Sequence, residues 1–190
     1  QDVLETVSQL LLTKLNETKA KNIISYEVVD DYEIDRDRIF AMDNISEEDF
    51  DKEWKVFEAR AEKTNSMNRY YKLDSKGEKE FAKQLEQNEN ILLFTKLKKG
   101  GFVIDTPYGN YSPDWAIVYR NPDEDSDKKI GVYFIAESKI DKEWNDLTGE
   151  EQDKINCGKL HFKAVSELVR FDWIKNYQDF KKKFGVKDSI

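Results

Sequence analysis

Two carboxylates and one lysine stand out because each lies beside an apolar run typical of a buried strand. Asp114 precedes the apolar residues 115–119, and Glu137 follows the apolar residues 130–136, with Lys139 two positions further on. Neighbouring carboxylates repel each other unless a cation or hydrogen bonds offset the repulsion. Mg²⁺ offsets it and prefers carboxylate and water oxygens. The three residues therefore predict a magnesium site, with Mn²⁺ as a substitute, of the kind that hydrolyses phosphodiesters.

The chemistry assigns a role to each of these residues. We expect Asp114 and Glu137 to be the metal ligands. We expect Lys139 to orient the attacking water or to stabilise negative charge on the phosphorus oxygens. Because two adjacent carboxylates favour a protonated lysine, the electrostatic role of Lys139 is preferred over that of a general base.

A predicted hairpin brings the two carboxylates together. Residues 121–127 (NPDEDSD) have a strong turn composition and separate the two apolar runs. Opposite residues in an antiparallel pair have a constant index sum, and Asp114 and Glu137 are centred inside this turn. The two residues should therefore be neighbours. Lys139 should share the face of Glu137, since side chains two apart on a strand point the same way.

An acid two residues before a lysine is not specific in so charged a chain. The spacing occurs six times among residues of which 37% are charged. Only Glu137 and Lys139 close a long apolar strand and lie opposite a Pro-Asp pair across a turn. This context distinguishes them from the other five occurrences.

The first 73 residues carry no recognisable chemistry, and we interpret them as an accessory or connecting region. Apolar spacing predicts an amphipathic helix that ends before Asn22. A capping box at Ser46 and Asp49 predicts the start of another helix. Its apolar stripe should contain Phe50, Trp54, Phe57 and Ala61. Between these helices we expect a strand at 23–29 and an exposed connection at 30–38.

Residues 74–190 have the pattern of one α/β domain, and we place the nuclease domain there. Gly158 should allow the later of its helices to approach the sheet closely. The apolar periodicity predicts helices at 77–87 and beyond Gly149, a basic last helix, and strands at 91–97, 102–104, 115–119, 130–136 and 169–173.

Composition limits the class of protein. The single cysteine, Cys157, excludes an intrachain disulfide and favours a reducing, cytoplasmic location. No apolar run is long enough to span a bilayer, so we expect no membrane partner. No phosphate-binding Gly-x-x-x-x-Gly-Lys-Ser/Thr run occurs, so any ATP-driven motor must lie outside these residues. Because the chain opens at Gln1 rather than Met, we expect it to be a fragment of a longer protein.

The net charge of −8 argues against a broad DNA-binding face. The argument weakens if other domains deliver the DNA, because a cleavage module then needs only a local cationic path to its metal. Lys96, Lys98 and Lys99, which lead into a Gly-Gly step, are the candidates for that path. A solvated surface is the alternative interpretation of this lysine cluster.

Three stretches in order resemble the C-terminal nuclease of type III restriction enzyme Res subunits, which have the PD-(D/E)XK motif. They are residues 108–116 (YGNYSPDWA), 133–139 (YFIAESK) and 154–162 (KINCGKLHF). The resemblance covers residues 78–162. It implies a restriction-endonuclease-like core, with a mixed central sheet flanked by helices, and magnesium-dependent cleavage of double-stranded DNA. It also implies two partners, a helicase or translocase domain of the same parent chain and a modification methyltransferase subunit.

The resemblance extends to individual positions. The family-like helix acid matches Glu78, which we expect near the metal; a glutamate that stabilises the helix start is the alternative. Lys154, in the third stretch, is a candidate phosphate contact. Ile140 departs from the pattern, because a glycine commonly follows the lysine there.

Two other functions remain open. A related repair or junction-resolving nuclease would share the metal site but prefer other DNA structures. A non-catalytic interaction module would fit the acidic balance and the unexplained first 73 residues, and it predicts no metal binding.

Overall fold

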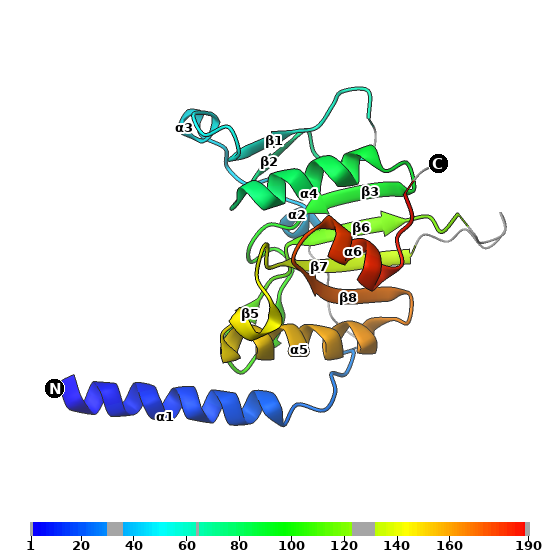
Figure 1. Cartoon of the computed structure of the whole chain (residues 1–190). Helices are drawn as coiled ribbons and strands as arrows, with labels where there is room; N and C mark the ends of the chain where they lie inside the picture. Colours follow the sequence, from blue (N-terminus) through cyan, green and yellow to red (C-terminus); the bar gives the residue numbers. More distant parts are fainter. Residues whose placement is uncertain (1, 30–35, 64, 123–131, 189–190) are drawn as a thin grey trace.

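Four strands form the central sheet, in the order β3, β6, β7 and β8 (Figure 1). This computed structural model describes residues 2–29, 36–63, 65–122 and 132–188. The four strands span, in sheet order, Ile91–Lys96, Trp115–Tyr119, Val132–Ser138 and Val169–Ile174. The pairs β3–β6 and β6–β7 are antiparallel, whereas β7 and β8 are parallel. The predicted mixed central sheet is confirmed.

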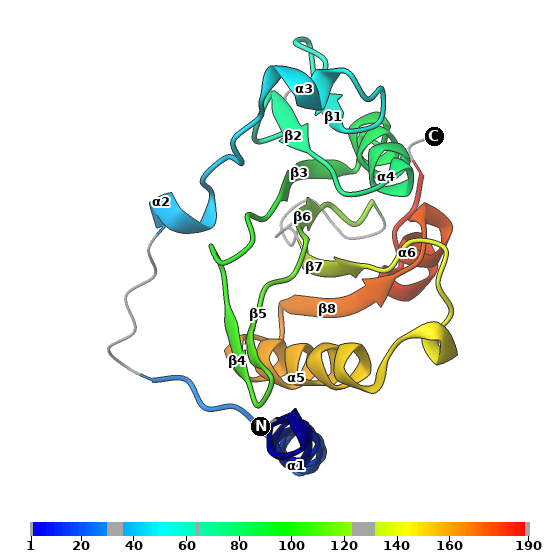
Figure 2. The same cartoon turned by 90° about the vertical axis from the view of Figure 1, so that its left-hand side faces the viewer.

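Helices cover both faces of this sheet. α4 (Lys76–Gln87) and α6 (Tyr177–Phe184) pack on one face, and α5 (Gly149–Val165) packs on the other (Figures 1 and 2). Parallel neighbours need a crossover connection, and α5 supplies it between β7 and β8. The α/β class is confirmed, and the arrangement is that of a restriction-endonuclease-like core.

The main core lies between the sheet and the helices α4 and α6. Trp115, Ile117 and Tyr119 alternate along β6 with less buried residues and point into this core. Phe81 and Leu85 share one side of α4, and Phe81 lies edge-on to Trp115 with ring centroids 5.4 Å apart. Three predicted elements are confirmed here to within one residue, namely the helix at 77–87 and the strands at 91–97 and 115–119.

A smaller core lies on the other face, beneath α5 and a short hairpin. The hairpin pairs β4 (Ile104–Thr106) with β5 (Gly109–Tyr111), so the strand expected at 102–104 starts only at Ile104. Phe171 of β8 stacks on Phe162 of α5 at 5.4 Å and meets Tyr111 edge-on at 6.3 Å. This aromatic cluster supports Tyr111, which reaches the candidate site described below.

Gly158 allows α5 to lie close to the sheet, as predicted. A Cβ placed on Gly158 would lie 2.7 Å from the Phe171 ring. Gly158→Val is therefore expected to lower the free energy of unfolding by about 2–3 kcal/mol, as overpacking does elsewhere. Urea denaturation measures this change. Gly149→Ala is the control: a Cβ there meets nothing within 4 Å, so its unfolding midpoint should stay close to that of the unaltered chain. Equal stability of both variants would contradict the close approach.

The first helix, α1 (Asp2–Lys21), ends before Asn22 as predicted. Its apolar side chains do not enter a core. The exposed ones are Val3, Leu4, Val7, Leu10, Leu11, Leu12 and Leu15. The helix lies alongside α5 and projects from the body (Figures 1 and 2). Amphipathic spacing thus predicted the helix but not a packed face.

Two predictions for the N-terminal region are wrong. Residues 23–29 form no strand: Tyr26 attaches them to the hairpin through a hydrogen bond to the Asp105 carbonyl (2.8 Å). The helix expected from Ser46 is a single turn, α3 (Glu47–Phe50). Its predicted capping box is present, since the Ser46 N–H donates to Asp49 at 2.9 Å.

The apolar stripe expected beyond Phe50 is not helical, and of its residues Phe57 lies in a strand while Trp54 and Ala61 lie in turns. β1 (Val56–Glu58) pairs with β2 (Tyr70–Lys72), and Phe57 lies opposite Tyr71 in the main core. The helical spacing of Phe57 with its apolar neighbours is a coincidence. Its strand conformation is determined by a partner strand more than ten residues away.

The remaining connections complete the fold. A short helix, α2 (Arg36–Ile39), is followed by an irregular segment, and a 3₁₀ turn, η2 (Trp144–Asp146), precedes α5. The predicted connection at 30–38 lies largely outside the described residues, as does the predicted turn after Pro122. Within the described ranges, no helix is both long and apolar enough to cross a membrane.

Candidate active site

The register of the β6–β7 hairpin is the one predicted. Trp115 pairs with Ala136, and every pair up to Tyr119 and Val132 keeps the same index sum. The next pair in this register is Asp114 and Glu137. Because the Asp114 N–H donates to the Ala136 carbonyl (3.2 Å), the ladder extends to the start of the site.

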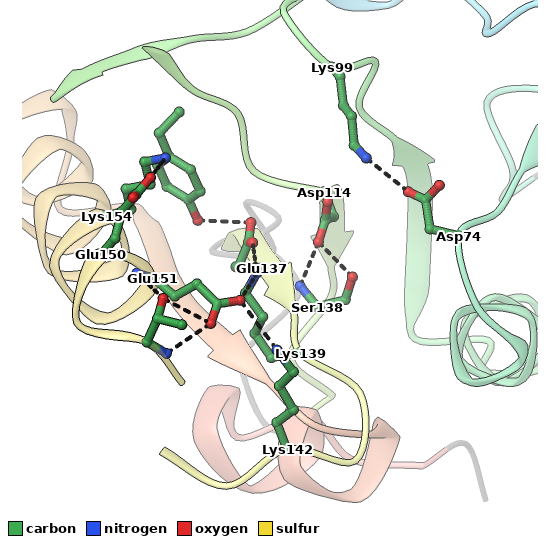
Figure 3. A network of polar contacts seen from close by, with 12 residues as sticks. Asp74, Lys99, Asp114, Glu137, Ser138, Lys139, Lys142, Glu150, Glu151 and Lys154 are labelled. Atoms are coloured by element: carbon green, nitrogen blue, oxygen red, sulfur yellow. Dashed lines mark hydrogen bonds and ion pairs between the residues drawn. The ribbon is translucent and has the colours of Figure 1, made fainter. Parts of the chain in front are cut away.

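These two carboxylates line a pocket at the end of the hairpin. The pocket has a volume of about 330 Å³ and lies between α5, β7 and the loops that precede α4 and β6 (Figure 3). It is lined by Asp74, Glu78, Lys99, Tyr111, Ser112, Asp114, Glu137, Ser138, Lys139, Glu151 and Lys154. Eight of the residues that line it are charged, which is typical of a site rather than a core.

Ser138 joins Asp114 to Glu78. The Ser138 N–H and Oγ lie 2.8 and 2.6 Å from Asp114 Oδ2, and Oγ also lies 3.0 Å from Glu78 Oε1. A hydroxyl has one proton and cannot form full hydrogen bonds to two carboxylates at once. Both contacts of the Ser138 hydroxyl can be hydrogen bonds only when one of the two carboxyl groups is protonated and donates to it. Burial and the nearby Glu78 charge raise the pKa of Asp114, although the Ser138 hydrogen bonds oppose this shift.

Glu137 is nearly enclosed, with 6% of its surface exposed. Its Oε2 accepts a hydrogen bond from the Tyr111 hydroxyl (2.9 Å), and its Oε1 lies 3.1 Å from the Lys139 ammonium. Burial and the adjacent Asp114 raise the pKa of Glu137 to about 8, against the opposing effects of Lys139 and Tyr111. The close pair of acids thus has the electrostatic frustration that a divalent cation would relieve.

Lys139 is held at the edge of the pocket. Its backbone N–H donates to the Ile174 carbonyl (2.8 Å), and its ammonium lies 3.1 Å from both Glu137 Oε1 and Glu151 Oε1. Burial lowers the pKa of Lys139, but the two carboxylates outweigh it, so the pKa lies above its ordinary value. A charged lysine agrees with the electrostatic role expected from the sequence.

Glu78 leans from α4 towards the sheet, as its helical position predicts. Its Oε2 accepts from the Asp74 N–H (2.8 Å) and pairs with Lys96 at 2.7 Å. The Lys96 side chain is 7% exposed, and the nearby carboxylates raise its pKa in spite of burial. Lys96 is therefore an internal partner of Glu78, and a contact with DNA remains only a prediction for it.

The other predicted DNA contacts are placed differently from one another. Lys99 is exposed and pairs with Asp74 at 3.3 Å, and Lys154 pairs with Glu150 at 2.5 Å. Both line the pocket, on its two sides (Figure 3). Lys98 is half-buried and does not line it.

Sequence analysis did not identify three residues that shape this site. Tyr111 and Ser138 lie inside the stretches that carry the family resemblance, so their proximity to the two acids was a usable signal. Glu151 is the third residue of α5 and was detectable only as part of the Thr148 capping box.

The donor set fits a magnesium ion. Mg²⁺ is usually bound by one or two carboxylates and keeps several waters, and Asp114 and Glu137 provide two. Within the described part of the chain, no three His, Cys, Asp or Glu side chains form a metal-binding group by themselves. An ion here would therefore take its remaining ligands from water and substrate oxygens.

Comparison with protein families agrees with this geometry. A family model described as an endonuclease domain matches residues 64–177, which include β3, the hairpin β6–β7, α5 and β8. The chain belongs to this family. No curated protein and no solved structure matches the chain.

The endonuclease-domain match includes every residue of the candidate site. It begins before residue 74, where the sequence suggested the nuclease domain starts. Residues 56–73 also share the main core, through Phe57, Tyr71 and Leu73. The division into 1–73 and 74–190 stays a prediction.

Proposed function

We propose that this endonuclease domain is a magnesium-dependent DNA nuclease and the cleavage module of a type III restriction enzyme Res subunit. The observation that supports it most is the pairing of Asp114 and Glu137 at the end of one hairpin, with Lys139 in the same pocket. The specific subunit assignment rests on the three sequence stretches that resemble that family.

The site residues divide the work of hydrolysis. Asp114 and Glu137 would hold the ion, and Ser138 and Tyr111 fix these carboxylates through hydrogen bonds. A bound magnesium ion supplies positive charge that polarises the phosphodiester and activates water. Lys139 places its ammonium where negative charge develops on the phosphorus oxygens. Glu78 would act indirectly, because it contacts the Ser138 hydroxyl, which in turn contacts Asp114.

In this proposal, the domain contacts DNA only through a few cations beside the pocket. Lys99 and Lys154 flank it, and each is paired with an acid that phosphate can replace. The net charge of −8 implies that affinity for DNA comes mainly from elsewhere. A helicase or translocase domain of the parent chain and a methyltransferase subunit are the partners we propose for that task.

Calorimetric titration with MgCl₂ and MnCl₂ tests the metal site directly. We expect both ions to bind the unaltered chain and neither to bind Asp114→Ala. Equal heats for both proteins would contradict the assignment. Absence of any binding would favour a non-catalytic interaction module.

Substrate preference separates the two nuclease alternatives. In magnesium at high protein concentration, the restriction module should cleave supercoiled and linear duplexes. A repair or junction-resolving nuclease should prefer branched DNA over a linear duplex of the same sequence.

A further inference from the structure

The Lys139 ammonium has a fixed position that its own backbone does not explain. A lysine side chain has a flexible four-carbon stem and ends in a compact positive charge. The Glu137 pairing alone cannot hold it in place, because an ion bound by Glu137 competes for that carboxylate. The second carboxylate, Glu151, lies at the same 3.1 Å distance and is not part of the Asp114–Glu137 pair.

Glu151 is itself rigidly held. Its Oε2 accepts from the Thr148 N–H (3.0 Å) and lies 3.3 Å from Thr148 Oγ1, which accepts from the Glu151 N–H (3.2 Å). Gln152 donates to the Trp144 and Leu147 carbonyls at 2.9 and 3.2 Å, which fixes the start of α5. Capping therefore uses one oxygen of Glu151, and the other faces the ammonium (Figure 3).

The charge of Glu151 persists at working pH. Burial alone would raise its pKa, but the Thr148 hydrogen bond and the Lys139 charge bring it to about 2. Lys142 also approaches Glu151 Oε1, at 3.4 Å, from a more exposed position. Glu151 thus forms a permanent anion at the outer wall of the pocket.

We propose that Glu151 is a positioning residue that holds the Lys139 ammonium over the pocket, independently of Glu137. The role rests on the proposed nuclease function, because the ammonium is held where the phosphate would react. An ordinary helix cap would need only Oε2. The contact between Oε1 and Lys139 is what distinguishes positioning from capping.

The variant Glu151→Gln separates the two roles, since glutamine also completes a capping box. We expect kcat for DNA cleavage to fall about tenfold or more, as for other residues that orient a functional group, with KM for DNA within about twofold. In a Lys139→Met background, Glu151→Gln should have no further effect on kcat. Glu167→Gln, an exposed glutamate beyond α5, controls for the change in charge.

A second readout does not depend on cleavage. In metal-free buffer, the urea midpoint of the Glu151→Gln, Lys139→Met double variant should equal that of the less stable single variant. Midpoint shifts that add would overturn the proposal, as would kcat effects that multiply in the Lys139→Met background. If the unaltered chain neither cleaves DNA nor binds Mg²⁺ or Mn²⁺, the proposed function fails, and the midpoints alone then decide whether Glu151 holds Lys139.

Discussion

Asp114→Asn and Glu137→Gln are each expected to lower the rate of magnesium-dependent DNA cleavage about a thousandfold. Both substitutions preserve side-chain size and remove one of the charges that would hold the ion. Metal-assisted stabilisation is worth several kcal/mol, and about 4 kcal/mol corresponds to about a thousandfold in rate. Lys139→Met should cost about a hundredfold, because it removes positive charge from the place where negative charge develops.

Conversion of supercoiled plasmid to nicked and linear forms, followed over time, measures these rates. Glu80→Gln and Lys83→Met are the matched controls, because both residues are exposed on α4 and do not line the pocket. They should cleave at the unaltered rate. Circular dichroism checks that every variant is folded. If Glu137→Gln cleaves as fast as the controls, Glu137 does not belong to the catalytic site.

Glu137→Gln is also expected to stabilise the metal-free protein at alkaline pH. The folded protein raises the pKa of Glu137 from 4.5 to about 8, so the folded state binds a proton that the unfolded state has already lost. The free energy of unfolding therefore falls as pH rises through this window. At a value of ~1.4 kcal/mol per pKa unit, the advantage of the variant should grow by about 3 kcal/mol between pH 5.5 and pH 8.

Urea denaturation with a chelator present, at pH 5.5, 7 and 8, tests this dependence. Glu80→Gln should follow the unaltered chain at all three values, since Glu80 is exposed. If the free energy of unfolding changes with pH by the same amount in the unaltered chain and in Glu137→Gln, the folded protein does not raise the pKa of Glu137. A residue that weakens the fold while serving the site is expected where function and stability compete.

The hairpin could be predicted from sequence because its information is local. The apolar runs around residues 115–119 and 130–136 are nearly symmetric about a strongly turn-forming segment, so both type and register followed from index arithmetic. The observed pairing of Trp115 with Ala136 is the pairing that this arithmetic gives. Glu78 was also foreseeable, because helical spacing placed it beside Phe81 and Leu85.

The rest depends on contacts between segments that are distant in sequence. Lys96 looked like part of a surface cluster with Lys98 and Lys99, but α4 places Glu78 against it, 18 residues away. Phe57 matched a helical stripe, yet its conformation comes from pairing with Tyr71. No local pattern contains such partners, so the environment of Lys96 and the strand conformation of Phe57 could not be predicted from the sequence around them.

The carboxyl groups of this pocket can take up and release hydrogen ions. The Ser138 hydroxyl has one proton for both Asp114 and Glu78, and burial raises the pKa of Asp114 and brings that of Glu137 to about 8. Any dication that uses these carboxylates must displace protons as it enters. Its apparent affinity therefore rises with pH, and the heat of binding includes the ionisation heat of the buffer. In a cell, the surrounding pH and the supply of free dications would act on the same equilibrium.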